Sequence, residues 1–269
     1  MTNRRNVLKL GLLSTAASAL TVAAPAAIAQ TANPKTYVLV PGAWHGAWAW
    51  RDVANNLRKL GHQVYALTNT GLGDRAHLIS KDITLETHIT DIVQAVEVEE
   101  LKSVILVAQG FGCTPALGAA DRLAGRLRHI VLLDGLFSEN GRSTFDSLPP
   151  EVGEARRKVA QETSGGVTFP AIKAEFLGAS DPTVAAWADS KFRPQPLSTY
   201  ADKMVLKNPL GNGAPVTYIA AVAPLYRPLA KTHEIVRTQK TDWKYVEFAG
   251  GHVANYTHPE GIAKLLVEI

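Results

Sequence analysis

Two ionisable side chains in this sequence stand where they could move protons. Asp134 ends the apolar stretch HIVLLD, and a carboxylate at the end of a buried strand costs free energy unless a partner neutralises it. His252 follows two glycines in the stretch FAGGHVANY, and an imidazole exchanges protons near neutral pH. A histidine oriented by a carboxylate acts as a general base, so the first expectation is a site that accepts protons from water or substrate.

A glycine-rich turn and a second glycine supply the rest of the candidate site. The stretch AQGFGC (108–113) joins an apolar run to a helical pattern, and Gly110 stands at its tip. Glycine at such a tip tolerates a positive φ, where a side chain would store about 1–3 kcal/mol of strain. Gly42 follows another apolar run and allows a sharp turn, which is expected to aim the amide of Ala43 at a developing negative charge.

A parallel sheet is expected to bring these residues together. Short apolar runs alternate with helical patterns and are predicted as strands, at 36–40, 63–68, 103–108, 129–134, 215–222 and 243–250. Such alternation is typical of an α/β fold with a mostly parallel sheet and helices on both faces. Sites in these sheets lie at the C-terminal ends of the strands, where the sequence places Ala43, Gly110, Asp134 and His252.

Residues 135 to about 212 interrupt this alternation with proline- and glycine-rich stretches and helical pieces. We predict that they form an inserted helical lid over the sheet. The lid carries aromatic residues that suggest a small, partly apolar substrate, namely Phe145, Phe169, Phe176 and Trp187.

Residues near the strand ends are predicted to line the substrate pocket. They are Trp44, His45, Gln109, Arg75 and His77. The loop 68–78, which carries the last two, is equally well interpreted as a hydrogen-bonded turn of structural value only. Trp48 and Trp50 are expected in the core.

Residues 1–29 are typical of a twin-arginine-type signal peptide. Arginines at positions 4 and 5 precede an uncharged stretch rich in alanine and leucine, which ends in an A-x-A cleavage pattern at 27–29. An uncleaved membrane anchor is the alternative, and the weak hydrophobicity of the stretch disfavours it. We therefore expect a periplasmic or secreted chain of residues 30–269 that forms one domain.

Composition excludes several classes of function. Cys113 is the single cysteine, so neither a disulfide framework nor a cysteine-rich metal site is expected, and no cofactor is implied. Three of the 28 basic residues and none of the 24 acidic ones lie in residues 1–29, which leaves a net charge of +1. Without a run of lysine and arginine, nucleic acid is not an expected partner, and no second apolar stretch points to a membrane. The expected partner is a small-molecule substrate, and a homodimer stays open.

Together these stretches resemble one branch of the α/β-hydrolase superfamily, which includes plant salicylate methylesterases, hydroxynitrile lyases and methylketone synthases. The matching stretches lie between residues 37 and about 262 and include VLVPGAWHGAWAW, TGLGDRAHL, TLETHITDIV, HIVLLD and GGHVANYTHP. The resemblance implies the α/β-hydrolase fold with His252 as the catalytic base and Asp134 as the acid that orients it. It also implies an oxyanion hole formed by the backbone amides of Ala43 and Phe111.

The sequence departs from this family at the nucleophile. The family pattern around the turn is Gly-His-Ser-aromatic-Gly-Gly, where this chain has AQGFGC, so Gly110 takes the place of the serine. Differences at four of the six positions favour natural divergence over a single engineered change. Cys113 lies within the first helical turn, so its thiol is expected to point away from the tip.

Without the serine, no acyl-enzyme forms by the usual route. The remaining histidine, carboxylate and amide donors suit general-base catalysis on a small ester or carbonyl compound, in a lyase, isomerase or water-addition reaction. Two alternatives stay open. One is a catalytically silent protein that binds a small ligand, and the other is an esterase with an unrecognised nucleophile such as Ser138.

Overall fold

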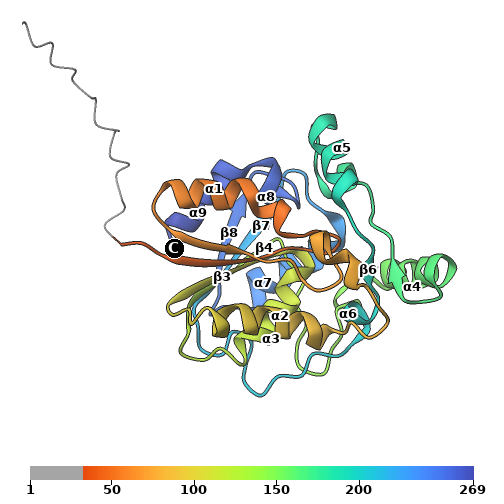
Figure 1. Cartoon of the computed structure of the whole chain (residues 1–269), viewed down its shortest axis with the longest axis horizontal. Coiled ribbons are helices and arrows are strands. Elements are labelled where there is room, and N and C mark those ends of the chain that lie inside the picture. The colour runs from red at the N-terminus through yellow and green to blue at the C-terminus, as the bar shows by residue number, and fades with distance from the viewer. Residues whose placement is uncertain (1–32) are drawn as a thin grey trace, which may run out of the picture.

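A six-stranded sheet forms the centre of the computed structural model, which describes residues 33–269 (Figure 1). The strand order is β2-β1-β3-β4-β7-β8, and each neighbouring pair is parallel. The strands are β1 (Thr36–Val40), β2 (Gln63–Ala66), β3 (Val104–Gln109), β4 (Leu127–Leu133), β7 (Val216–Ala221) and β8 (Lys244–Phe248). This order puts β3 and β4, the two strands that lead to Gly110 and Asp134, side by side in the middle of the sheet.

Helices cover both faces of this sheet, so the predicted α/β fold with a parallel sheet between helices is confirmed. One face carries α1 (Arg51–Lys59), α8 (Ala254–Thr257) and α9 (Pro259–Val267), and the other carries α2 (Leu85–Val98), α3 (Cys113–Ala120) and α7 (Ala230–Gln239) (Figure 1). Short 3-10 turns lie between these elements: η1 (Ala47–Trp50), η2 (Gly73–Leu78), η3 (Gly110–Gly112), η4 (Phe145–Ser147), η5 (Ala174–Leu177) and η6 (Arg227–Leu229).

The strands separate two hydrophobic cores because their side chains point alternately to opposite faces. On β1, Val38 and Val40 pack into the core that contains α2 and α3, whereas Tyr37 and Leu39 pack against α1 and α9. Burial on both faces explains why the strands read as continuous apolar runs rather than as alternating ones.

The chain between β4 and β7 contains most of the remaining elements, and we call residues 135–212 the lid segment. It includes α4 (Pro150–Ser164), α5 (Pro182–Lys191), α6 (Ser198–Ala201) and a small antiparallel pair, β5 (Thr168–Phe169) with β6 (Gln195–Pro196). Figure 1 shows α4 and α5 at the same end of the molecule, beyond the sheet. The N–H of Trp44 donates to the side-chain oxygen of Gln195 at 3.0 Å, which ties the lid segment to the loop after β1.

The predicted signal peptide, residues 1–29, lies outside the described residues. Among residues 33–269, no helix has both the length and the apolar character needed to cross a bilayer.

Candidate active site

The turn after β3 has the positive φ that its sequence predicts. Gly110 has φ +56° and begins η3, which leads directly into α3. A Cβ placed on this glycine would lie 3.2 Å from Nε2 of His252, so the tip of the turn faces the imidazole. The carbonyl oxygen of Gly110 accepts the N–H of Leu136 at 3.0 Å. This bond connects the turn after β3 with the turn after β4.

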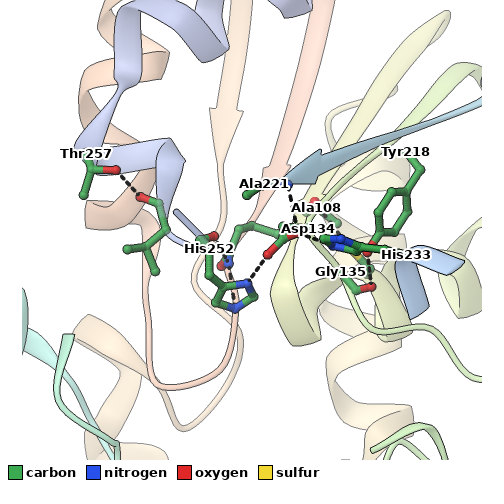
Figure 2. Close-up of polar contacts among 11 residues, drawn as sticks. Ala108, Asp134, Gly135, Tyr218, Ala221, His233, His252 and Thr257 are labelled. Carbon is green, nitrogen blue, oxygen red and sulfur yellow. Dashed lines mark hydrogen bonds and ion pairs between the residues drawn. The ribbon is translucent and has the colours of Figure 1, made fainter. Parts of the chain in front are cut away.

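Asp134 lies in that second turn and joins two imidazole rings (Figure 2). Its carboxylate is completely buried and is 2.7 Å from Nδ1 of His252 through Oδ2, and 2.6 Å from Nε2 of His233 through Oδ1. Oδ1 also accepts the backbone N–H of Ala221 at 3.0 Å. Burial raises the pKa of Asp134, but the hydrogen bonds from His233 and His252 outweigh it, and the pKa lies below its usual value. The carboxylate is therefore ionised at neutral pH.

His252 lies in the loop between β8 and α8, and Gln109 fixes which of its nitrogens carries the proton. The amide nitrogen of Gln109 is 3.2 Å from Nε2 of His252 and 3.0 Å from the backbone oxygen of the same residue. An amide nitrogen only donates, so Nε2 is the acceptor and Nδ1 holds the proton that is donated to Asp134. This is the tautomer that a general base needs, because Nε2, the nitrogen beside Gly110, keeps its lone pair.

Two aromatic contacts complete the surroundings of the base. The ring of Tyr226 stacks on His252, with the centroids 4.6 Å apart. His45 is buried and places Nδ1 2.5 Å from the carbonyl oxygen of Ala43. Burial lowers the pKa of His45 to about 3, so this ring is neutral and stabilises the loop after β1 without competing for protons.

A small cavity of about 20 Å³ lies at the tip of the turn, which is room for about one water molecule. Seven residues singled out in the sequence line it, namely Ala43, Trp44, His45, Gln109, Gly110, Phe111 and His252. The N–H of Ala43 has no protein acceptor within residues 33–269. The base, the glycine tip and the two residues predicted to supply amide donors thus lie around one space.

Arg75 and His77 do not line this cavity, contrary to the predicted pocket. They lie on η2, which follows the edge strand β2, and the Arg75 guanidinium donates to the carbonyl oxygen of Thr68 at 3.1 Å. Arg75 also pairs with Asp91 at 3.4 Å. Of the two interpretations of loop 68–78, the hydrogen-bonded turn is the one that the contacts favour.

The aromatic residues singled out in the lid segment pack elsewhere as well. Phe145 and Phe169 are buried against Tyr200, Trp187 contacts Trp48, and Phe176 is exposed. The lid residues that line the cavity are instead Leu136, Leu148, Arg156, Leu177 and Tyr200.

The two other nucleophiles considered in the sequence do not face the base. Cys113 is buried and donates to the carbonyl oxygen of Ala108 at 3.3 Å, and burial raises the pKa of its thiol well above the usual value. Ser138 is completely buried, does not line the cavity and makes no side-chain hydrogen bond within the described residues.

The sequence reasoning missed His233, Arg156 and Tyr226. His233 lies on α7, 99 positions after the carboxylate it contacts, in a helical stretch with no glycine-rich loop to mark it. The one signal available was its place beside Val236 on the buried face of that helix. No local sequence pattern distinguished Arg156 and Tyr226, because only the course of the folded chain brings them to the cavity.

Comparison with known proteins identifies the family. The pattern of the Alpha/beta hydrolase family matches residues 37–265, so the chain belongs to that family and is an enzyme of it. A carbendazim hydrolyzing esterase from Nocardioides sp. (strain SG-4G) is 36% identical over 248 residues, which cover 87% of this chain and 98% of that protein. Methylesterase 9 from Arabidopsis thaliana is 28% identical over 148 residues, and these cover 54% of this chain and 58% of that relative.

Solved structures show the same fold at lower identity. An extracellular alpha/beta-hydrolase from a Paenibacillus species superposes with a TM-score of 0.75 at 24% identity, covering 87% of this chain and 98% of that one. Tomato methylketone synthase I, solved with 2-tridecanone, superposes with a TM-score of 0.72 at 19% identity, covering 88% and 97%.

Proposed function

We propose that this chain is a cofactor-free hydrolase in which His252 activates water directly and no serine nucleophile takes part. The substrate is a small, partly apolar ester or related carbonyl compound. The observation that carries the proposal is the space at Gly110. The base has its Nε2 beside a residue without a side chain, and the adjoining cavity holds about one water molecule.

The reaction that follows from this arrangement needs no covalent intermediate. Nε2 of His252 takes a proton from the water, and the water oxygen bonds to the substrate carbonyl carbon. The negative charge that forms on the carbonyl oxygen is held by the amides of Ala43 and Phe111, and one such donor contributes roughly 3 kcal/mol to transition-state stabilisation. The protonated imidazole then returns the proton to the leaving oxygen as its bond to carbon breaks.

Asp134 and Gln109 have separate parts in this proposal. The ionised carboxylate stabilises the imidazolium that forms during the reaction. Gln109 holds the lone pair of Nε2 in place, and its bond to the backbone oxygen of His252 persists when the water takes over Nε2. The base is thus oriented before the substrate arrives.

A panel of small esters together with carbendazim, the compound in the name of the Nocardioides relative, tests the proposal. We expect turnover without an initial burst, no labelling by a fluorophosphonate, and a loss of about 10²–10⁴ in kcat for His252→Ala. Covalent labelling of the unmodified chain would reveal a serine nucleophile and overturn the water mechanism. Turnover that survives His252→Ala would show that His252 is not the general base. Binding of these compounds without turnover in any assay would show that the chain binds ligands but does not catalyse this reaction.

We also propose that residues 1–29 direct export to the periplasm or the medium. The paired arginines and the A-x-A pattern support this. The test is the N-terminal sequence of the chain recovered from the native host. We expect it to begin at Gln30, and a chain that keeps its first residues in the cytoplasm would contradict the proposal.

A further inference from the structure

We infer that the substrate carries a carboxylate, or a similar anionic group, which binds to Arg156 in the lid segment. The inference deepens the proposed function, on which it rests for the position of the reacting atoms. It starts from an unsatisfied donor. Arg156 projects from α4 into the wall of the cavity, and its Nη1 is enclosed yet has no hydrogen-bond partner.

An enclosed guanidinium nitrogen without an acceptor is unfavourable, since its N–H groups have lost water and gained nothing in return. No ion pair joins Arg156 to a carboxylate in the described part of the chain. Asp134, the carboxylate that contacts the base, is already bonded to two histidines and a backbone amide. A ligand anion is the acceptor that the arrangement lacks.

Aromatic side chains surround the guanidinium on several sides. Its central carbon lies 5.4 Å from the ring centroid of Trp44, 5.6 Å from that of Phe169 and 5.3 Å from that of Tyr200. Such contacts act on the charge through the ring faces. The hydroxyls of Tyr200 and Tyr226 also hydrogen-bond to the guanidinium, so the enclosed Nη1 is the donor left for a carboxylate oxygen.

Tyr226 connects Arg156 with the base. Tyr226 stacks on His252, and its hydroxyl is close enough to Arg156 that the guanidinium opposes the rise in its pKa caused by burial. Arg156, Tyr226 and His252 line the same cavity. An acid group at Arg156 and a carbonyl group beside Gly110 would therefore belong to one compact substrate, and the cavity of about 20 Å³ must widen to admit it.

Arg157 provides a matched control on the same helix. It follows Arg156 directly, is exposed, and lies over the ring of Phe145 with its guanidinium carbon 4.0 Å from the centroid, outside the cavity. Replacing either arginine by glutamine removes one charge from α4. Only the replacement at 156 removes the proposed anion contact.

The test is calorimetric binding of acetate, hexanoate and benzoate to the His252→Ala variant of the full chain, each compared with its uncharged amide. We expect at least one carboxylate to bind more tightly than its amide. Arg156→Gln should weaken that binding about tenfold to a hundredfold, and Arg157→Gln should leave it unchanged. Arg156→Lys keeps the charge and the aliphatic stem, so its affinity for the carboxylate should lie between those of the other two variants. It also tests the inference if Arg156→Gln does not fold.

Equal binding of acids and amides, or carboxylate binding that survives in both Arg156 variants, would overturn the inference. Because the measurement uses a variant without the base, its outcome is independent of turnover. Failure of the water mechanism would leave carboxylate binding intact, and failure of the arginine contact would leave the kinetic effect of His252 intact.

Discussion

Gln109, the last residue of β3, donates its side-chain amide to Nε2 of His252 at 3.2 Å, from the position directly before the glycine tip. The same amide nitrogen bonds to the backbone oxygen of His252 at 3.0 Å, so one side chain orients both the ring and the main chain of the base. The hydrogen bond that a serine hydroxyl would make to the base in a hydrolase triad is thereby made by an amide.

Replacing Gln109 by glutamate should reverse this contact. A carboxylate accepts, so it would hold a proton on Nε2 of His252 and remove the lone pair that the base uses. We expect Gln109→Glu to lower kcat at neutral pH by about 10²-fold and to move the rising limb of the pH–rate profile to higher pH. Gln94→Glu, on the exposed face of α2, adds the same charge and should not change kcat. An unchanged profile in Gln109→Glu would mean that Nε2 does not accept the proton.

His233 and His252 share one carboxylate but should differ in their effect on turnover. His252 touches the cavity, whereas His233 reaches it only through Asp134, which makes His233 a positioning residue. We expect His252→Gln to lose about 10²–10⁴ in kcat, and His233→Gln to lose roughly tenfold with KM unchanged. Steady-state kinetics of the two variants over a range of pH separates these outcomes. Equal losses would place both rings in the reaction.

Asp134 should make folding sensitive to acid. Its pKa in the folded chain lies below the value near 3.9 of an unfolded chain, so the ionised form stabilises the fold at neutral pH. This contribution is lost as pH falls below about 5 and through the folded-state pKa. Asp134→Asn should lower the free energy of unfolding at pH 7 by about 3 kcal/mol and flatten its acid dependence. Urea unfolding at a series of pH values measures both, and a parallel pH dependence in the two proteins would show that other groups dominate.

Gly110→Ser should create a nucleophile. The Cβ of the new residue would lie 3.2 Å from Nε2 of His252, which brings the hydroxyl within reach of the base. We expect labelling by a fluorophosphonate and an initial burst with esters, together with a loss of about 1–3 kcal/mol of stability because φ is positive at this position. Gly110→Ala carries the same strain without the hydroxyl and should show neither labelling nor burst. A Gly110→Ser variant that folds and stays unlabelled would show that Gln109 keeps the base from a nucleophile at the tip.

The sheet and the pairing of His252 with Asp134 could be predicted from sequence because parallel strands end at one edge. A buried apolar run followed by a polar residue identifies such an end without knowledge of the rest of the fold. Ala43, Gly110 and His252 line the cavity, and Asp134 contacts His252.

The remainder of the site depends on packing that no local pattern records. Arg75, like Arg156, is an arginine that could bind an anion in the pocket. Its contacts with Asp91 and Thr68 instead hold it near the edge of the sheet. Arg156 and His233 lie on helices whose sequences are ordinary, and only the route of the chain after β4 and β7 brings them to the centre. The sequence indicated which residues belong to the lid segment, but not which of their side chains face the cavity.

The five lid residues that line the cavity belong to one continuous stretch of chain, the lid segment 135–212, while the base, its carboxylate partner and the amide donors come from outside that stretch. Selectivity and reactivity are thus encoded in separable parts of the polypeptide. A chimaera in which only this stretch is replaced by that of a relative would therefore acquire the substrate preference of the relative. It would keep the proton-transfer residues of this chain.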